Sequence, residues 1–392
     1  MPHYNYLIIG GGMTADAAVQ GIRAVDAEGT VGLISSESNP PYNRPPLSKG
    51  LWKGEPVENI WRKTETRGVE LHLGREAKQL DAKNHQATDD RGTIYTFDKL
   101  LLATGARVRK LPFGVEHIIY YRTLDDYHRL RAMAGEGKQF AVIGGGFIGW
   151  EVAAALAMNG SKVSMLFPDE GIGARLYPRE LSQFLNAFYR EKGVEVFPGE
   201  AAVALQESGG GLRLEAKSGR AFQVDGVVAG IGVQPNTELA QAAGLKTGNG
   251  VAVNENLQTS HADIYAAGDV AEFANPALGR RLRVEHEDNA NTMGLAAGQN
   301  MAGQSAPYHH LPFFYTDLFD LGYEAVGDLD SRLETYADWK ATFREGVVYY
   351  LAGGRVRGVL VWNTWGQVDN ARRLIAEPGP FKASDLKGRL PA

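Results

Sequence analysis

Two short glycine-rich segments have the residue types that bind a dinucleotide. Gly10, Gly12 and Ala15 follow an apolar run at residues 7–9, and a similar segment returns at residues 141–149. Glycine permits a tight turn that brings main-chain amides close to a pyrophosphate, whose charge a following helix N-terminus favours. An ordinary glycine-rich turn is the alternative, but two copies in the same context argue against it.

Acidic residues follow each segment at the distance expected of a ribose ligand. Glu37 follows the first copy, and Asp169 with Glu170 follows the second. A carboxylate there accepts hydrogen bonds from a ribose diol and repels a 2′-phosphate, so the second copy favours NADH over NADPH. Arg175 lies close enough in sequence to reach either a 2′-phosphate or the NAD pyrophosphate, and the sequence leaves both roles open.

The elements around both segments alternate as in an α/β fold. Each glycine-rich turn lies between a buried strand and a helix, and later strands end in Ala103-Thr104-Gly105 and Ala267-Gly268-Asp269. From about residue 313 apolar and polar residues alternate, which predicts an antiparallel sheet. The expected strands are 31–34, 99–102, 162–167, 224–228, 263–266, 342–352 and 357–362, and the expected helices are 15–25, 151–159 and 368–377.

Composition excludes several classes of function. With 41 Lys and Arg against 46 Asp and Glu, the formal charge is 41 − 46 = −5, so nucleic acid is not an expected partner. The 392 residues include no cysteine, which excludes disulfides, thiolate metal sites and thiol redox chemistry. No apolar run reaches the roughly 18 residues of a membrane span, and no signal peptide is recognisable, so we expect a cytoplasmic protein.

Two dinucleotide sites in a chain without cysteine predict a flavoprotein. One site is expected to hold FAD tightly and the other to exchange NADH, with a hydride passing between them.

Several longer motifs extend this interpretation. They are Pro41-Tyr42-Asn43-Arg44-Pro45-Pro46-Leu47-Ser48-Lys49, Gly144-Gly145-Gly146-Phe147-Ile148-Gly149-Trp150-Glu151 and Arg283-Val284-Glu285-His286-Glu287-Asp288-Asn289-Ala290. With them the sequence resembles, over nearly its whole length, the FAD-dependent NAD(P)H oxidoreductases that include the apoptosis-inducing factors and the ferredoxin reductases of oxygenase systems. It is most similar to bacterial proteins of the apoptosis-inducing-factor type.

The resemblance implies two Rossmann-like domains, with the FAD domain interrupted by the NAD domain, and a C-terminal α+β module. FAD-binding sequence is expected at residues 1–113 and 245–308, NAD-binding sequence at 114–244, and the C-terminal module at 309–392.

The same resemblance implies catalytic roles. Lys49 and Glu151 are expected to pair beside the flavin, where a cation stabilises the anionic reduced form. Phe147 is expected to cover the nicotinamide side of the flavin, and His286 to lie near both rings. From residue type alone, Lys49 reads as a solvated loop lysine, Glu151 as a helix first-turn acid, and a lone histidine as structural.

Further residues are implied as cofactor ligands. Asp269 is expected to hold the ribityl chain, Arg44 and Arg122 to contact FAD, Glu287 to begin a helix facing the flavin, and Tyr315 and Glu324 to lie near the cofactors. The other expected ligands are Met13, Thr14, Ser36, Ala77, Ala103, Thr104, Gly105, Gly145, Gly146, Ile148, Gly232, Gly268 and Glu285. No metal is expected, because the adjacent His309 and His310 lack further ligands.

The predicted function is therefore an FAD-dependent NADH oxidoreductase that passes electrons to an acceptor such as a ferredoxin or a quinone. The alternative is an NADH redox sensor that forms a stable charge-transfer complex and changes its oligomeric state or partner. The sequence is compatible with a monomer, with a homodimer and with a redox-dependent change between the two.

Overall fold

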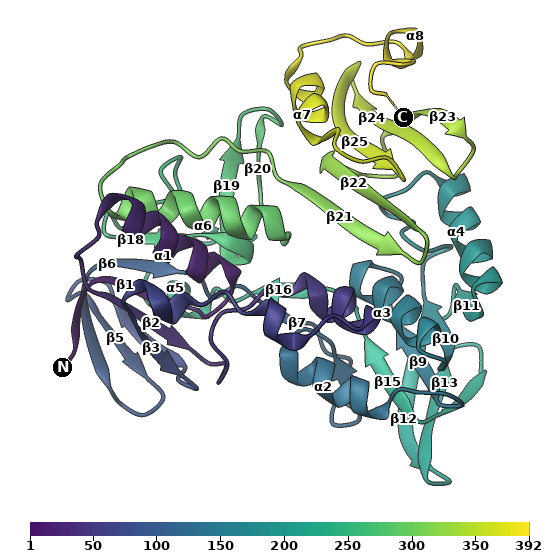
Figure 1. The fold of residues 1–392 in the computed structure, drawn as a ribbon, viewed down its shortest axis with the longest axis horizontal. Coiled ribbons are helices and arrows are strands. Elements are labelled where there is room, and N and C mark those ends of the chain that lie inside the picture. The colour runs from purple at the N-terminus through teal and green to yellow at the C-terminus, as the bar shows by residue number, and fades with distance from the viewer. Residues whose placement is uncertain (392) are drawn as a thin grey trace. The chain divides into compact units, whose positions relative to one another are not determined.

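A computed structural model describes residues 1–391, which divide into two compact units (Figure 1). The first unit contains Met1–Arg44, Val57–Arg107 and Gln234–Phe313. The second contains Pro45–Pro56, Val108–Val233 and the chain from Phe314 onward. Strands β7 (Ala106–Val108) and β16 (Val233–Pro235) each contain a point where the chain passes from one unit to the other.

The first unit is built on a seven-stranded sheet. Its strands run in the order β3-β2-β1-β6-β5-β4, with β18 also paired to β6. Strands β1, β2, β3, β6 and β18 are parallel, and β4 and β5 form an antiparallel extension. Leu7, Ile8 and Ile9 are buried on β1, as expected for a parallel strand covered on both faces. The strands are β1 (His3–Ile9), β2 (Val31–Ser35), β3 (Val69–Leu73), β4 (Ala77–Asp81), β5 (Gln86–Asp89), β6 (Ile94–Leu102) and β18 (Ile264–Ala266).

Two helices of this unit, α1 (Met13–Val25) and α6 (Glu287–Met301), lie side by side (Figure 1). Glycine on α6 makes this close approach possible. A Cβ at Gly298 would lie 2.0 Å from the Ala18 carbonyl oxygen, and one at Gly294 would lie 2.4 Å from that of Thr14. The second half of α6 and the first half of α1 therefore share one tightly packed interface.

Shorter elements complete the first unit. They are the three-stranded sheet β17 (Val251–Ala252), β19 (Ala271–Asn275) and β20 (Arg280–Leu282), the helix α5 (Glu238–Ala242) and the 3₁₀ turns η3 (Val57–Ile60), η4 (Thr64–Arg67) and η5 (Gly268–Val270).

The second unit contains a parallel sheet of order β11-β10-β9-β15-β8 and an antiparallel sheet of order β12-β13-β14. Its first strands are β8 (Ile118–Tyr120), β9 (Gln139–Ile143), β10 (Lys162–Phe167), β11 (Val194–Pro198), β12 (Ala202–Ser208), β13 (Gly211–Ala216), β14 (Ala221–Val224) and β15 (Gly226–Ala229). Its helices here are η1 (Pro45–Ser48), η2 (Gly50–Lys53), α2 (Leu124–Met133), α3 (Phe147–Met158) and α4 (Arg179–Glu191).

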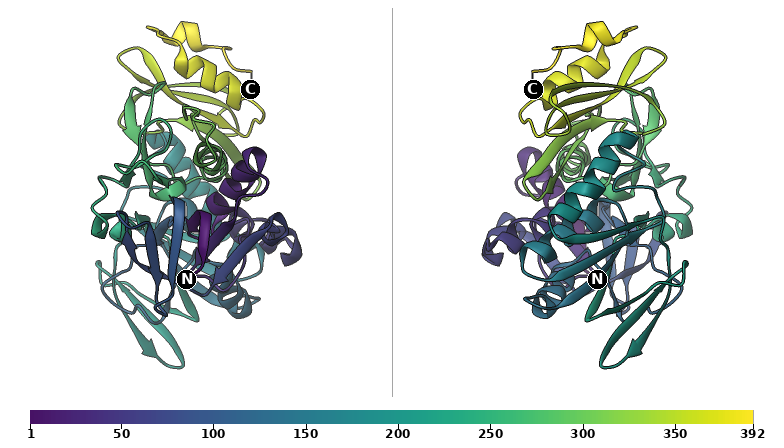
Figure 2. Two further views of the ribbon diagram at one scale, coloured as in Figure 1. Left: turned by 90° about the vertical axis from the view of Figure 1, so that its left-hand side faces the viewer. Right: turned by 90° about the vertical axis from the view of Figure 1, so that its right-hand side faces the viewer.

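The C-terminal part of the second unit is a five-stranded sheet of order β21-β22-β25-β24-β23, drawn in yellow-green to yellow in Figure 2. Helix α7 (Val368–Ala376) packs against β22 and β25. The strands are β21 (Phe313–Leu318), β22 (Leu321–Gly327), β23 (Glu334–Ala341), β24 (Glu345–Ala352) and β25 (Arg355–Trp362), and a short helix α8 (Ala383–Leu386) follows.

Most elements predicted from the sequence are confirmed, within a few residues at their ends. One strand prediction was wrong, because residues 224–228 form the ends of two strands rather than one. Asp225 separates them, and its carboxylate accepts the Gln139 amide at 2.8 Å, which breaks the extended run. The predicted strand at 342–352 begins only at Glu345, since a turn occupies the residues before it. The functional boundaries at residues 113, 244 and 308 stay a prediction.

Candidate functional site

The first glycine-rich turn has the backbone that a pyrophosphate site requires. Gly10 has a φ of +125°, and a Cβ there would lie 2.0 Å from the Ala103 carbonyl oxygen. Gly12 is the N-cap of α1, no side chain caps that helix, and a Cβ on Gly12 would meet nothing within 4 Å. The start of α1 therefore has open space beside Gly12 and no side-chain cap, which fits an anionic ligand.

The second turn repeats this geometry. Gly144 has a φ of +124°, and its Cβ would lie 2.3 Å from the Gly230 carbonyl oxygen. Gly146 caps α3 without a side chain and also faces open space. A Cβ on Gly149 would lie 2.0 Å from the Gly144 carbonyl oxygen, so the third position of this copy must be glycine. Each unit thus presents one uncapped helix N-terminus that fits a dinucleotide.

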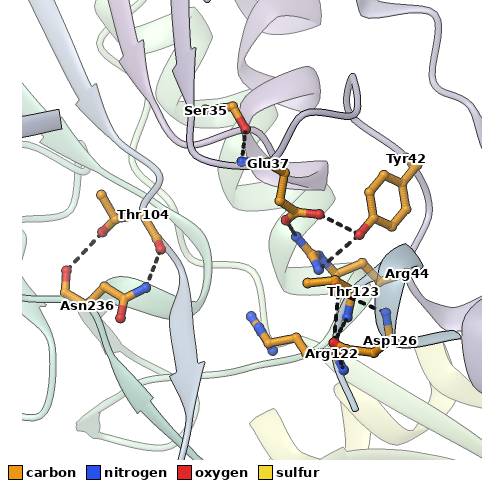
Figure 3. Close-up of polar contacts among 9 residues, drawn as sticks. All are labelled: Ser35, Glu37, Tyr42, Arg44, Thr104, Arg122, Thr123, Asp126 and Asn236. Atoms are coloured by element: carbon orange, nitrogen blue, oxygen red, sulfur yellow. Dashed lines mark hydrogen bonds and ion pairs between the residues drawn. The ribbon is translucent and has the colours of Figure 1, made fainter. Parts of the chain in front are cut away.

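Glu37, the first predicted ribose acceptor, lies in a compact polar group (Figure 3). Its carboxylate accepts the Tyr42 hydroxyl at 2.7 Å and pairs with the Arg44 guanidinium. Burial by itself lowers the pKa of Arg44, but the neighbouring Tyr42, Glu37 and Asp269 raise it overall. A carboxylate has about four acceptor positions, so Glu37 can still accept a ribose diol.

A second polar contact holds the end of β6 (Figure 3). The Thr104 hydroxyl donates to the Asn236 carbonyl at 2.9 Å, and the Asn236 amide donates to the Thr104 carbonyl at 2.8 Å. Asn236 was not predicted from the sequence, because the contact joins residues far apart in the chain. The pair fixes the backbone beside the predicted ligands Ala103 and Gly105.

The acidic residues after β10 are each paired with an exposed arginine. Arg175 lies 3.3 Å from the Asp169 carboxylate, and Arg179 lies 3.3 Å from that of Glu170. The arginine side chains are 81% and 72% exposed, so these pairs are weak in water. Arg179 was not among the residues predicted from the sequence.

The predicted pair of Lys49 and Glu151 is present in the second unit. The Lys49 ammonium lies 2.6 Å from Glu151 Oε1, and the side chains are 13% and 5% exposed. Two hydroxyls also donate to this carboxylate, Ser48 to Oε2 and Thr316 to Oε1, each at 2.5 Å. Thr316 was not predicted, because it lies more than 160 residues from Glu151, whereas Ser48 belongs to the motif that contains Lys49.

Aromatic side chains lie beside Lys49 and at the start of α3. The Lys49 ammonium lies 5.3 Å from the centre of the Tyr315 ring. Phe147, at the start of α3, contacts the rings of Trp150 and Phe314 at centroid distances of 4.8 and 5.6 Å. A cation beside aromatic faces and a buried carboxylate is held away from bulk water, which strengthens its electrostatic effect.

Other predicted ligands lie at element ends. Gly268 has a φ of +75°, and its Cβ would lie 2.3 Å from the Thr14 hydroxyl, so the start of η5 packs closely on α1. Arg283 donates to the Asp269 carbonyl at 3.1 Å and pairs with Glu285 at 2.5 Å. These contacts tie the segment before α6 to the end of β18.

The remaining predicted residues are placed as follows. His286 is the N-cap of α6 and Glu287 its first residue, Ser36 follows β2, and Ala77 begins β4. Arg122 precedes α2, and its amide donates to Asp126 at 3.0 Å (Figure 3). Glu324 accepts the Gly366 amide at 2.9 Å, and Gly232 lies in the loop before β16 with a φ of +93°.

The structure divides the predicted residues between the units. The first unit holds Gly10, Gly12, Met13, Thr14, Ala15, Ser36, Glu37, Arg44, Ala77, Ala103, Thr104, Gly105, Gly268, Asp269, Glu285, His286 and Glu287. The second holds Lys49, Arg122, Gly145, Gly146, Phe147, Ile148, Glu151, Asp169, Arg175, Gly232, Tyr315 and Glu324. Their roles toward the cofactors stay predictions.

One group within residues 1–391 has the side chains of a metal site. Ligand atoms of His85, His261 and Asp263 lie within 4.8 Å of one another. The Lys99 ammonium pairs with the Asp263 carboxylate, so the group already has its cation. His310, for its part, pairs with Asp288 at 2.6 Å.

Comparisons with known proteins agree with this arrangement. The model of the pyridine nucleotide-disulphide oxidoreductase family matches residues 4–294, and that of the C-terminal region of mitochondrion-associated apoptosis-inducing factor matches residues 297–342. The chain therefore belongs to the pyridine nucleotide-disulphide oxidoreductase family. Since its sequence contains no cysteine, it cannot perform the thiol chemistry in the family's name.

Individual relatives cover almost the whole chain. The 5,5′-dehydrodivanillate O-demethylase ferredoxin reductase subunit of Sphingobium sp. is 36% identical, over 96% of this chain and 94% of the relative. Apoptosis-inducing factor 1 of Dictyostelium discoideum is 35% identical, over 95% and 78%. Putidaredoxin reductase, in its covalent complex with putidaredoxin, superposes with a TM-score of 0.91 at 28% identity, over 98% of this chain and 95% of the other.

These findings confirm the predicted fold class and the predicted FAD-dependent NADH oxidoreductase. No helix among the described residues has the length and hydropathy needed to cross a bilayer.

Proposed function

We propose that this chain is a ferredoxin reductase that takes electrons from NADH through FAD and delivers them to an iron–sulfur protein. The observation that carries the proposal is the pair of uncapped glycine-rich helix N-termini, with φ values of +125° and +124° at their first glycines. The acceptor class is supported by relatives whose names describe ferredoxin reductases. The same relatives favour turnover over the redox-sensor alternative.

The chain's own residues supply binding and orientation. The amides at the start of α1 are assigned to FAD and those of α3 to NADH, with FAD-binding sequence at 1–113 and 245–308, NAD-binding sequence at 114–244 and the C-terminal module at 309–392. Bound FAD supplies the acceptance of a hydride and the release of single electrons. Lys49 places a positive charge at the reacting end, and Glu151 keeps that charge in place.

Asp169 and Glu170 are assigned to the selection of NADH. Their charges repel a 2′-phosphate, and the exposed arginines offset this repulsion only in part. We also propose a cytoplasmic location, which the bacterial ferredoxin reductase relatives and the missing cysteines support.

An anaerobic titration of purified holoprotein with NADH tests the function. Rapid bleaching of the flavin absorbance, then reoxidation by a [2Fe–2S] ferredoxin over many turnovers, is the expected result. A quinone and oxygen serve as the competing acceptors. A long-wavelength band that persists with every acceptor would favour the redox sensor, and protein that binds no flavin would contradict the proposal.

A variant links this titration to the site. Lys49→Met removes the ammonium but keeps a side chain of similar length, so flavin content should stay the same while reduction by NADH slows by at least tenfold. Lys53→Met is the matched control, because Lys53 pairs with Asp317 on the surface. Wild-type rate and flavin potential in Lys49→Met would remove Lys49 from the mechanism.

A further inference from the structure

The carboxylate of Glu151 receives more hydrogen bonds than an ion pair with Lys49 requires. Thr316 is fully buried and Ser48 is 8% exposed, and both hydroxyls lie 2.5 Å from the carboxylate. A third residue, Trp150, is fully buried and donates its indole N–H to Thr316 Oγ1 at 3.0 Å. These residues come from η1, α3 and β21, three segments of the second unit that are remote in sequence.

The direction of each hydrogen bond follows from the chemistry of the donors. An indole nitrogen can only donate, so Trp150 occupies an acceptor position of the Thr316 hydroxyl. The single hydroxyl proton of Thr316 is then directed to Glu151. The Ser48 hydroxyl has two acceptors within reach of its single proton. Its oxygen lies 2.5 Å from Glu151 Oε2 but 3.5 Å from the Pro45 carbonyl oxygen. Its proton also goes to the carboxylate.

We propose that Thr316 and Ser48 are positioning residues that act on the reaction through Glu151, with Trp150 orienting Thr316. The proposal rests on the function assigned above to Lys49. Each hydroxyl holds one carboxylate oxygen, so the carboxylate cannot rotate about its last bond. Oε1 is thereby fixed as the partner of the Lys49 ammonium.

Lys49 needs this support because its ammonium is a point charge on a flexible four-carbon chain. It makes one hydrogen bond to Glu151 and lies over the ring of Tyr315, the residue next to Thr316. Strand β21 therefore contributes to the site twice, once through a ring beside the cation and once through a hydroxyl on its counterion. A shift of the carboxylate would move the charge relative to the reacting atoms, which lowers the rate without loss of binding.

The test compares Thr316→Val with Thr316→Ser in the flavin-loaded protein. Valine keeps the shape but removes the hydroxyl, so we expect the rate of flavin reduction at saturating NADH to fall roughly tenfold, while KM for NADH changes less than about twofold. Serine restores the hydroxyl and should restore the rate. Ser48→Ala should show a smaller loss of the same kind.

A double-mutant cycle separates positioning from stability. In a Glu151→Gln background, Thr316→Val should cause no further loss of rate, because its effect passes through the carboxylate. Additive losses would overturn the proposal, as would a wild-type rate in Thr316→Val. Since valine leaves the Trp150 N–H without its acceptor, Thr316→Val/Trp150→Phe serves as the second variant if Thr316→Val folds poorly.

Two readouts do not depend on turnover. The flavin midpoint potential should shift in Thr316→Val and return in Thr316→Ser, and a crystal structure of Thr316→Val should show the contact between Lys49 and Glu151 lengthened or lost. An unchanged contact and potential would overturn the positioning role. Failure of wild-type protein to accept electrons from NADH would instead overturn the proposed function, so the two failures are distinguishable.

Discussion

The two glycine-rich turns have nearly the same backbone, yet the buried carboxylates that follow them have different partners. Gly10 and Gly144 agree in φ to within a degree, and both helices begin at an extended glycine. After these turns, α1 buries Asp16 and α3 buries Glu151, which lies one position further along its copy of the motif. The same turn geometry therefore occurs in both units, and the side chains that follow the turn determine the role of each copy.

Asp16 is held as a structural carboxylate. Arg62 and Arg67 pair with it at 2.7 and 3.0 Å, and Thr64 and Gln20 each donate to it at 2.6 Å. Two cations and two further donors satisfy its oxygens and tie α1 to the segment around η4. No acceptor capacity is left for chemistry.

Glu151 has one cation and two hydroxyls, and the cation is partly exposed. The pair is neutral as a whole, and the Lys49 ammonium has two further N–H groups that Glu151 does not take. A buried carboxylate with excess cations stabilises the fold, whereas one with a single cation can position a charge for a reaction. The difference between the two regions lies in their partners.

Gly10→Ala should have the largest effect on stability. The new Cβ would overlap the Ala103 carbonyl, at a φ that side chains rarely adopt, so the free energy of unfolding should fall by roughly 4 kcal/mol. Gly12→Ala is the matched control, because its Cβ meets nothing and the fold should keep its stability while flavin is lost. Differential scanning calorimetry and the ratio of flavin to protein absorbance measure both. Full flavin content in Gly12→Ala would contradict the pyrophosphate assignment.

Asp16→Asn and Glu151→Gln should give opposite results. The first leaves two arginines near a neutral amide in a buried site, so the free energy of unfolding should fall by about 3 kcal/mol. The rate of reduction per bound flavin should stay the same. The second should lose less stability and slow flavin reduction more than tenfold. Chemical denaturation and stopped-flow absorbance test this, and an equal rate loss in both variants would break the comparison.

Local patterns made the turns and most strands predictable, because each depends on neighbouring residues. The glycine spacing predicted both turns, whereas the pairing of Lys49 with Glu151 was implied by the family resemblance and not by local pattern. Thr316 was not predictable, since a threonine on an alternating strand has no local mark of its distant partner. The break at Asp225 was missed for the same reason, because the carboxylate of Asp225 accepts a hydrogen bond from Gln139, which is remote in the sequence.

Asp89 offers a pH test of a further structural carboxylate in the first unit. Burial by itself raises its pKa, but the Thr93 and Arg91 amides, the Tyr95 hydroxyl and Arg75 lower the pKa to about 2. The ordinary value is 3.8, so the ionised side chain contributes its full stabilisation above about pH 4 and loses it as the pH falls toward 2.

The size of this contribution is about 2 kcal/mol, which is the shift in pKa expressed as free energy. The free energies of unfolding of wild type and Asp89→Asn, measured by urea unfolding, should therefore differ most at about pH 5 and above and converge only as the pH falls below about 2. Glu65→Gln, at an exposed position, is the control and should follow wild type throughout. A difference that does not change with pH would rule out ionised Asp89 as its source.

The acidic residues after the two turns extend the comparison to cofactor exchange. Glu37 pairs with Arg44 and accepts the Tyr42 hydroxyl, and the side chains of Glu37 and Arg44 are only 24% and 22% exposed. Asp169 pairs with Arg175, whose side chain is 81% exposed. A fixed acceptor suits a dinucleotide that stays bound, and a loosely paired one suits a dinucleotide that exchanges, because less structure must reorder at each binding event.

Asp169→Asn/Glu170→Gln should accordingly change selectivity and little else. Without the two charges, the ratio of kcat/KM for NADH over NADPH should fall about tenfold, mostly through KM for NADPH, while flavin content and thermal stability stay close to wild type. Glu191→Gln, an exposed neutralisation on α4, controls for net charge and should leave the ratio unchanged. If the ratio is also unchanged in the double variant, the arginines already cancel the repulsion, and selection of NADH must depend on other contacts with the adenosine ribose.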